Sequence, residues 1–426
     1  MVLKVSLNNW RGRLALGILV LAGSSLLVVV IVSRFVIGTL GDDRLKVTRD
    51  MLQVPLGYLP NSARLNARLA AAELSESDRD LVSAKAHALR AINLSPNDHR
   101  FRVTLASIQE AEGDRAAAEA SLEAARSLAP NDWRVHYRLG NLLVREGKLT
   151  QSLEEFRIAV AANNTVLPGT LDLVWRASRG DLEAVQTVAG TSPKARLTLA
   201  QFLVNVSRPT EAASVFGSID RAGRVASSLE STNFLNSLIA AGELGSARDL
   251  WSEIVGGDRQ STLVWNGGFE RDLSKDFAQF DWTLGRSEYA RFVIDAAVAR
   301  TGSRSLRVEF AGRDTTLLDN EVRQLVAVRP GVRYSLECYA KASELETPEG
   351  PRVVVSSGPS AWIAASDPVV HGTGDWQRLV VDFVAPQSAS GATTAVLISI
   401  KRKPKFSYDE PTRGTVWFDD FSLKEQ

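Results

Sequence analysis

The chain has 426 residues, of which 45% are hydrophobic, and its 50 basic residues almost balance its 49 acidic residues. This length predicts two or three domains with folded cores, and the balanced charge predicts no nucleic acid or other polyanion as a partner. With one cysteine, Cys338, the chain has no internal disulfide framework, and one cysteine with four histidines argues against a Cys/His zinc site.

The first predicted element is an apolar helix near the N-terminus. Residues 14–33 (LALGILVLAGSSLLVVVIVS) contain no charged side chain, and basic residues flank them at Arg11, Arg13 and Arg34. About 20 apolar residues, at a rise of 1.5 Å each, cross the roughly 30 Å hydrocarbon core of a bilayer. We therefore predict a transmembrane helix over residues 14–36, preceded by an N-terminal arm over residues 1–13.

A cleaved signal peptide is the alternative interpretation, because Ser24 and Ser25 follow a first apolar run. The apolar run then resumes at residues 26–32, which favours a retained single-pass anchor. Basic residues lie on both sides of the span, so the flanking charges are weak evidence of orientation. We expect the N-terminus to be cytoplasmic and the C-terminal domains to be periplasmic or extracellular, because single-span proteins commonly translocate their bulk.

A helical repeat region follows a connector predicted over residues 37–61, where Pro55, Gly57 and Pro60 argue against a long helix. From residue 62 the composition becomes rich in Ala, Leu, Arg and Glu, which is typical of helices. Ser-Pro-Asn-Asp at residues 95–98 recurs as Ala-Pro-Asn-Asp at residues 129–132, 34 residues later. We predict that the aspartate of each copy caps the next helix.

This period resembles the tetratricopeptide repeat, a helix-turn-helix unit of 34 residues. The best copy reads His136-x2-Leu139-Gly140, followed by Phe156, and the resemblance implies that Gly140 permits close helix packing. His136 stands in the tryptophan position of the pattern, so we predict a buried structural role for it. We expect such helix pairs over residues 62–255.

Stacked repeats of this kind form a superhelix with a concave groove, and the resemblance implies that protein partners bind there. Repeat position predicts that five residues line this groove: Arg100, Arg134, Tyr137, Arg138 and Asn141. They partly resemble the basic and asparagine clamp that some members of the family use for acidic peptide ends. The alternative is an ordinary solvated face.

A β-rich region begins after a linker predicted over residues 256–261. Residues 305–310 alternate cleanly between outward and inward positions, and about eight such runs within residues 262–426 predict a two-sheet antiparallel jelly roll. The fold class is therefore multidomain: a transmembrane helix, an all-α tetratricopeptide-like superhelix and an all-β sandwich.

A second resemblance is visible across this region. It rests on the WNGGFE run at residues 265–270, the TGSRSLRV run at residues 301–308, the GDW run at residues 374–376 and the VWFDDFSL run at residues 416–423. In this order they resemble carbohydrate-binding modules of the galactose-binding-like jelly-roll class. The resemblance implies a polysaccharide or oligosaccharide ligand, or a structural accessory domain that binds no sugar.

Sugar binding needs flat aromatic faces together with amide and acid groups. Trp362 follows a turn and is the preferred platform, and weaker candidates are Tyr289, Tyr339 and Asn320. Modules of this class commonly hold a structural calcium ion between the first and last strands. The resemblance therefore implies three oxygen ligands, Glu270, Asp419 and Asp420, for which solvated strand-end acids are the alternative.

The sequence does not predict an enzyme. It contains no glycine-rich phosphate loop, no G-x-S-x-G and no H-E-x-x-H, and its acids do not single out a glycosidase pair. Cys338 lies in a strand-like stretch and is predicted to be a small buried hydrophobe. We predict a membrane-anchored scaffold that binds proteins and glycan, in exopolysaccharide or envelope assembly. The alternatives are a scaffold for proteins alone with a structural jelly roll and, after it, a polysaccharide-active enzyme.

Overall fold

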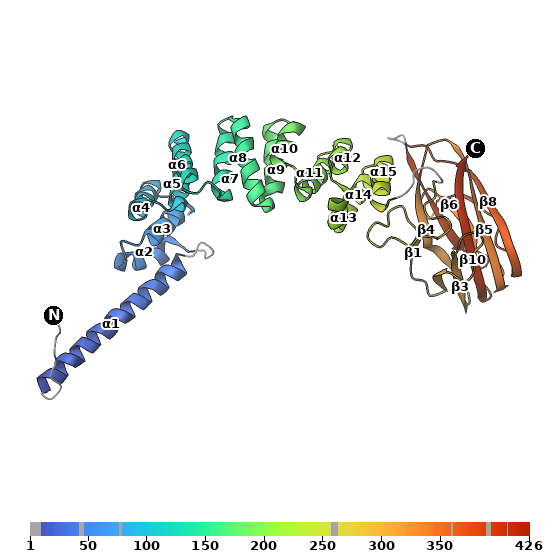
Figure 1. Cartoon of the computed structure of the whole chain (residues 1–426), viewed down its shortest axis with the longest axis horizontal. Coiled ribbons are helices and arrows are strands. Elements are labelled where there is room, and N and C mark those ends of the chain that lie inside the picture. Colours follow the sequence, from blue (N-terminus) through green and yellow to red (C-terminus); the bar gives the residue numbers. More distant parts are fainter. Residues whose placement is uncertain are drawn as a thin grey trace. The chain divides into compact units, whose positions relative to one another are not determined.

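The computed structural model describes residues 10–41, 47–75, 79–256, 263–358, 361–388, 393–406 and 408–426. The chain divides into two compact units, Met1–Gly190 and Thr191–Gln426. The first unit is helical, and the second unit joins further helices to a β-sandwich (Figure 1). Most of the arm predicted over residues 1–13 and of the linker predicted over residues 256–261 lies outside the described residues. The predicted domain bounds stay predictions.

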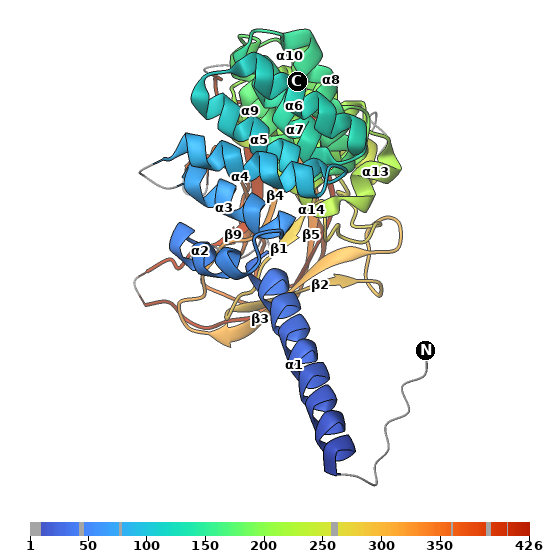
Figure 2. The ribbon, with the colours of Figure 1, turned by 90° about the vertical axis from the view of Figure 1, so that its left-hand side faces the viewer.

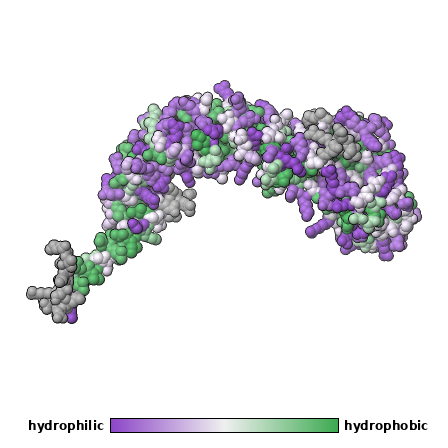
Figure 3. Space-filling model, viewed as in Figure 1, coloured by the Kyte–Doolittle hydropathy of each residue, from purple (hydrophilic) through white to green (hydrophobic). Residues whose placement is uncertain are grey.

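The first unit begins with a long apolar helix and continues as helix pairs. Its helices are α1 (Trp10–Leu40), α2 (Arg49–Tyr58), α3 (Ala63–Ser75), α4 (Leu81–Leu94), α5 (His99–Glu112), α6 (Arg115–Leu128), α7 (Trp133–Arg145), α8 (Leu149–Ala162), the 3-10 helix η1 (Asn164–Val166), α9 (Leu167–Ala177) and α10 (Leu182–Ala189). Within the described part of the chain, α1 is the one helix that is long and apolar enough to cross a membrane. None of its most apolar window is buried against the described residues, and Figure 3 shows this helix as a largely hydrophobic surface.

The helix pairs repeat as the sequence predicted. The second helices of successive pairs begin 34 residues apart, at Leu81, Arg115 and Leu149. Asp98 and Asp132 cap α5 and α7, since each carboxylate accepts a hydrogen bond from the backbone N–H two residues later. The tetratricopeptide-like architecture of this region is therefore confirmed.

Small residues allow the paired helices to approach closely. A Cβ atom added to Gly140 of α7 would lie 2.7 Å from Cε1 of the Phe156 ring on α8, so the ring occupies the space above the glycine. Ala106, Leu122 and Leu139 pack together in a neighbouring cluster. These contacts lie within one pair or between neighbouring pairs.

The region predicted as a connector over residues 37–61 contains the short helix α2. Leu52 of α2 is fully buried with Leu65 and Leu69 of α3, and Ile37 and Leu40 from the end of α1 pack on the same cluster. Pro55 lies inside α2, which has ten residues and is therefore compatible with the prediction against a long helix. The packing of the adjacent leucines outweighs the cost of the proline.

The second unit contains five helices and ten strands among the described residues. The helices are α11 (Pro193–Asn205), α12 (Pro209–Gly217), α13 (Arg221–Ala226), α14 (Ser228–Ala240) and α15 (Leu244–Val255). The strands are β1 (Thr283–Leu284), β2 (Ala290–Asp295), β3 (Ser305–Arg313), β4 (Leu318–Val328), β5 (Arg333–Glu346), β6 (Arg352–Ser356), β7 (Trp362–Ala365), β8 (Gly372–Val384), β9 (Thr394–Arg402) and β10 (Thr412–Glu425).

The strands form two antiparallel five-stranded sheets. Their orders are β1-β4-β9-β6-β7 for the first sheet and β2-β3-β10-β5-β8 for the second. Inward-facing residues of both sheets, such as Ile398 and Phe418, meet in one hydrophobic core. The predicted two-sheet sandwich is confirmed, and the two shortest strands, β1 and β7, are too short to show alternation in the sequence.

A buried tryptophan joins α15 to the sandwich. The Trp251 ring is fully buried, and it makes edge contacts with Trp265 at 5.0 Å and with Phe280 at 5.6 Å between ring centroids. Its Nε1–H donates a hydrogen bond of 2.9 Å to the carbonyl of Phe277. The last helices and the sandwich therefore share one packed joint.

Candidate functional site

The first candidate site is a groove of about 450 Å³ on the face formed by α3, α5 and α7. These are the first helices of three successive pairs, as the repeat resemblance implies for a concave binding face. The charged lining residues are Arg64, Arg68, Arg100, Arg134 and Asp132. Four guanidinium groups against one carboxylate give this groove a positive character.

Local ion pairs position the two arginines that the sequence predicted in this groove. The Nη2 atom of Arg100 lies 2.6 Å from Oδ2 of Asp98, and this pairing holds the pKa of the Asp98 carboxyl below its usual value. The guanidinium of Arg134 lies 3.8 Å from the carboxylate of Asp132 and is mostly exposed. The single lining carboxylate, Asp132, also accepts a hydrogen bond of 2.8 Å from Nε2 of His99.

The other three predicted groove residues do not line this cavity. Tyr137 packs its ring 5.9 Å from that of Phe156, and its carbonyl accepts a hydrogen bond of 2.7 Å from the Asn141 amide. Arg138 is exposed. Arg64 and Arg68 were missed, although their spacing of four residues places them on one helical face.

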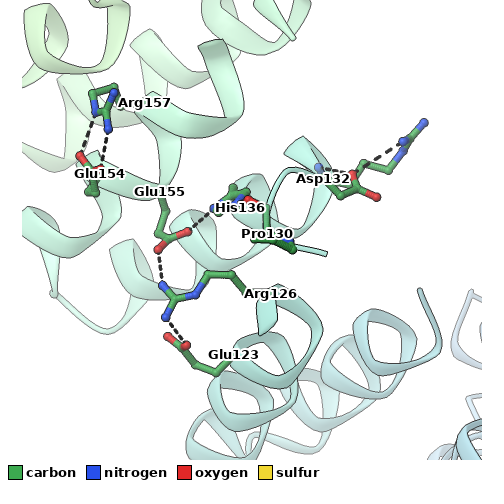
Figure 4. Close-up of polar contacts among 9 residues, drawn as sticks. Glu123, Arg126, Pro130, Asp132, His136, Glu154, Glu155 and Arg157 are labelled. Carbon is green, nitrogen blue, oxygen red and sulfur yellow. Dashed lines mark hydrogen bonds and ion pairs between the residues drawn. The ribbon is translucent and has the colours of Figure 1, made fainter. Parts of the chain in front are cut away.

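A buried polar network links α6, α7 and α8 beside the groove (Figure 4). His136 is buried, and its Nδ1 lies 2.6 Å from Oε2 of Glu155 while its Nε2 lies 2.8 Å from the carbonyl of Pro130. Arg126 bonds the second oxygen of Glu155 at 2.6 Å and also contacts Glu123. Both imidazole nitrogens lie within hydrogen-bond distance of an oxygen, so the ring is held from two sides.

The structure brings two of the predicted sugar-binding residues together on the outer face of the first sheet. Ile398 and Ile400 of β9 point into the core, so Lys401 points to the outer face. The Nζ atom of Lys401 lies 2.8 Å from Oδ1 of Asp319, 3.4 Å from Oδ1 of Asn320 and 6.0 Å from the centre of the Trp362 ring. The Trp362 side chain is 38% exposed, and the Asn320 amide donates a hydrogen bond of 3.0 Å to Asp319.

Lys401 and its neighbour Lys403 were missed by the sequence analysis. Lys401 is fully buried despite its charge, which its contact with Asp319 compensates. Lys403 is exposed, and its Nζ lies 4.6 Å from the Trp362 ring centre. The alternating pattern of β9 places Lys401 on the outer face, and no pattern in the sequence places Trp362 beside it.

The other two predicted aromatic residues lie away from this surface, Tyr339 on the second sheet and Tyr289 just before its strand β2. The Tyr339 ring on β5 is covered by the guanidinium of Arg300 at 3.3 Å, and its hydroxyl donates to Glu337 at 2.6 Å. Tyr289 precedes β2, and its carbonyl accepts a backbone hydrogen bond from Ala311. The structure therefore does not assemble the four predicted residues into one site.

The three predicted calcium ligands lie around Gly268. A Cβ atom built on this glycine would be 3.7 Å from an oxygen of both Asp419 and Asp420, and 3.9 Å from Cγ of Glu270. Asp419 is fully buried, and burial together with the Asp420 carboxylate raises the pKa of Asp419 to about 6.

Hydrogen-bond donors already hold each of these carboxylates. Glu270 accepts from the backbone N–H groups of Ser303 and Arg304, and Asp420 accepts from the Arg300 guanidinium at 2.7 Å. Within the described residues, no group of three or more His, Cys, Asp or Glu side chains has the arrangement of a metal site. The calcium prediction stays a prediction.

Cys338 points into the sandwich core and is buried. Burial strongly raises the pKa of its thiol, so the thiolate needed for nucleophilic chemistry is disfavoured. The prediction that this cysteine is a small buried hydrophobe is confirmed.

Comparison with known protein families and with curated proteins finds no match. Solved structures resemble parts of the chain. Pseudomonas aeruginosa pilF is 20% identical, with a TM-score of 0.29, and the match covers 44% of this chain and 87% of pilF. YrrB, a TPR protein with an unusual peptide-binding site, is 15% identical, with a TM-score of 0.26, and the match covers 49% of this chain and 93% of YrrB.

The sandwich region has its own resemblance. A CBM4 structure is 20% identical, with a TM-score of 0.28, and the match covers 38% of this chain and 99% of the CBM4 chain. The architecture described above rests on the chain's own repeat spacing and strand order.

Proposed function

We propose that this protein is a membrane-anchored, non-catalytic scaffold that holds a protein partner in its repeat groove and a glycan on its sandwich. The groove formed by α3, α5 and α7 carries the proposal, because three successive repeats contribute to one positively charged surface. Such a surface suits an extended segment that carries acidic side chains. A role in exopolysaccharide or envelope assembly would bring both ligands to one membrane.

The anchor part of the proposal has support from α1. Cleavage after the small residues at 22–25 would leave Leu26 to Val32 at the new N-terminus, and these side chains are exposed. Insertion into a bilayer would remove these apolar side chains from water, whereas cleavage would leave them exposed to it. Protease treatment of intact cells and of spheroplasts tests the orientation: cleavage of the C-terminal unit in either preparation agrees with it, and full cytoplasmic protection in both overturns it.

Charge reversal in the groove tests partner binding. We expect the double variant Arg64→Glu, Arg134→Glu to lose at least tenfold in affinity for a partner that copurifies with the full-length chain. The matched control is Arg157→Glu, an exposed arginine on α8 whose carboxylate partner, Glu154, is its own helix neighbour. Equal loss in both variants, or no loss in either, would contradict the groove as the binding surface.

Two aromatic substitutions test glycan binding. In affinity electrophoresis of the full-length chain in detergent, we expect Trp362→Ala to abolish retention by the glycan that retards the wild type. Tyr339→Ala should leave retention unchanged, because Arg300 covers that ring. If no glycan retards the wild type, with calcium supplied, the sugar-binding half of the proposal is wrong.

The second candidate function is a scaffold for proteins alone, with a structural sandwich. The contact of Lys403 with the Trp362 ring favours it, because the ammonium group occupies a ring face that a sugar would need. This candidate predicts full partner binding in Trp362→Ala and no glycan retention in the wild type.

Calcium remains a separate proposal for Glu270, Asp419 and Asp420. Its support is the crowding of three carboxylates, which a cation would relieve. Thermal unfolding of the full chain in millimolar calcium and in chelator tests it. A midpoint that rises with calcium, and does so less in Glu270→Gln, agrees with the proposal, whereas identical midpoints contradict it.

A further inference from the structure

The helix α2 presents an apolar stripe to solvent. Met51, Val54 and Tyr58 lie on one side of the helix and are 53%, 67% and 85% exposed. Their spacing of three and four residues places them on one helical face. Leu52 and Leu56 occupy the opposite face and pack against α3. Single exposed apolar residues are common, but three on one face form a surface that needs an explanation.

The position of this stripe follows from the packing of α1, α2 and α3. Ile37 and Leu40, in the last turn of α1, share a hydrophobic cluster with Leu52 and Leu56 of α2. Figures 1 and 2 both place α2 beside the C-terminal end of α1, with α3 farther along the direction of α1. The face of α2 opposite α3 therefore points back toward the apolar part of α1.

The apolar part of α1 indicates where a bilayer would lie relative to α2. If residues 14–33 cross the hydrocarbon core, the end of α1 at Leu40 lies seven residues beyond it, at about 10 Å for a rise of 1.5 Å per residue. Amphipathic helices that lie in a membrane surface occupy this headgroup and acyl boundary, with their apolar faces about 5–10 Å deep.

We propose that α2 is a membrane-surface helix, whose Met51, Val54 and Tyr58 side chains insert into the boundary of the leaflet that α1 leaves. The inference rests on the proposed membrane anchor. Tyrosine is one of the residues that membrane interfaces favour, since its ring is apolar and its hydroxyl polar.

Pro55 fits a helix at the surface better than one at hydrocarbon depth. Proline has no backbone N–H, so the carbonyl of Met51 loses its usual donor four residues later. Water in the headgroup region can satisfy this carbonyl, whereas the hydrocarbon core cannot.

The consequence is a second contact between the first unit and the bilayer. A lone spanning helix can tilt and rotate in the bilayer. Because α2 packs on a cluster that also contains residues of α1 and α3, its contact with the membrane surface would fix the orientation of α3 relative to the membrane plane.

Site-directed spin labels on the full-length chain in nanodiscs test the inference. The native Cys338 is buried and is replaced by serine in all variants. Labels are placed at Val54→Cys on α2, at Val29→Cys on α1 and at Val82→Cys on α4, and these valines are 67%, 60% and 81% exposed. Accessibility to oxygen, which concentrates in lipid, is compared with accessibility to a water-soluble nickel complex.

We expect the ratio of oxygen to nickel accessibility to be highest at residue 29, intermediate at residue 54 and lowest at residue 82. A residue 54 label as accessible to nickel as the label at residue 82 overturns the inference while residue 29 still reports lipid. Loss of the lipid signal at residue 29 instead overturns the anchor itself. Protection of residue 54 from both reagents, or spin-spin broadening between chains, would show that protein covers the stripe and would also overturn the inference.

Discussion

The helical repeats of the first unit and the sandwich of the second bury their side chains in different ways. Around α5 to α8 the apolar contacts form small clusters between helices that are close in sequence, such as Ala106 with Leu122 and Leu139. The sandwich has one core, and its central strands pair across long sequence distances, as Val308 of β3 does with Val416 of β10. Local contacts allow repeats to open singly, whereas a shared core makes the sandwich unfold as a whole.

Truncation in the shared core should give the largest effect. Phe418 is fully buried on β10, and we expect Phe418→Ala to destabilise the sandwich by about 3–5 kcal/mol, from lost burial and an unfilled cavity. Native-state hydrogen exchange should show loss of protection in both sheets together. Loss confined to β10 and its two neighbours would break the comparison, because the sandwich would then open locally.

Removal of the buried histidine should give a large but local effect. We expect His136→Ala to destabilise the α6 to α8 region by about 3 kcal/mol, because the buried carboxylate of Glu155 loses a partner. Hydrogen exchange should increase in these helices, while α3 and α4 keep their protection. The matched control is His99→Ala, since the contact of His99 with Asp132 is partly exposed and should contribute at most about 1 kcal/mol. Equal effects of the two variants would contradict the role of burial.

A surface contact in the sandwich should give the smallest effect, and this effect should be lost in acid. Hydrogen bonds from Arg378 and Tyr339 lower the pKa of Glu337 to about 2. Because this value lies below the unfolded value of about 4.3, the carboxylate stabilises the fold above pH 4.3 and loses this contribution as the pH falls toward 2. The melting-temperature difference between the wild type and Glu337→Gln should therefore shrink over this range. A difference independent of pH would contradict the assignment.

The sequence predicted those parts of the structure that local patterns encode. The 34-residue period, the capping aspartates and the alternation in the strands each depend on residues within one element or its neighbour. These patterns also predicted that Arg100 and Arg134 lie in the groove.

Tertiary packing determined what the sequence left out. α2 forms despite Pro55 because Leu52 and Leu56 pack on a cluster whose members come from three helices. Trp362 and Asn320 both lie near Lys401. The sequence pattern places Lys401 on the outer face, but its neighbours there follow only from the order of the strands in the sheet. Tyr339, which has the right chemistry for a sugar platform, is instead covered by Arg300.

The Trp251 joint has a mechanical consequence. Its indole is fixed by edge contacts with Trp265 and Phe280 and by a hydrogen bond to the carbonyl of Phe277. A force applied to a ligand of the sandwich would be transmitted to α15 by the packed rings of Trp251, Trp265 and Phe280, in addition to the covalent chain. The sandwich would thus transmit force to the helices. A truncation of the chain at Gly256 would remove Trp265 and Phe280 and expose the buried Trp251 ring to water.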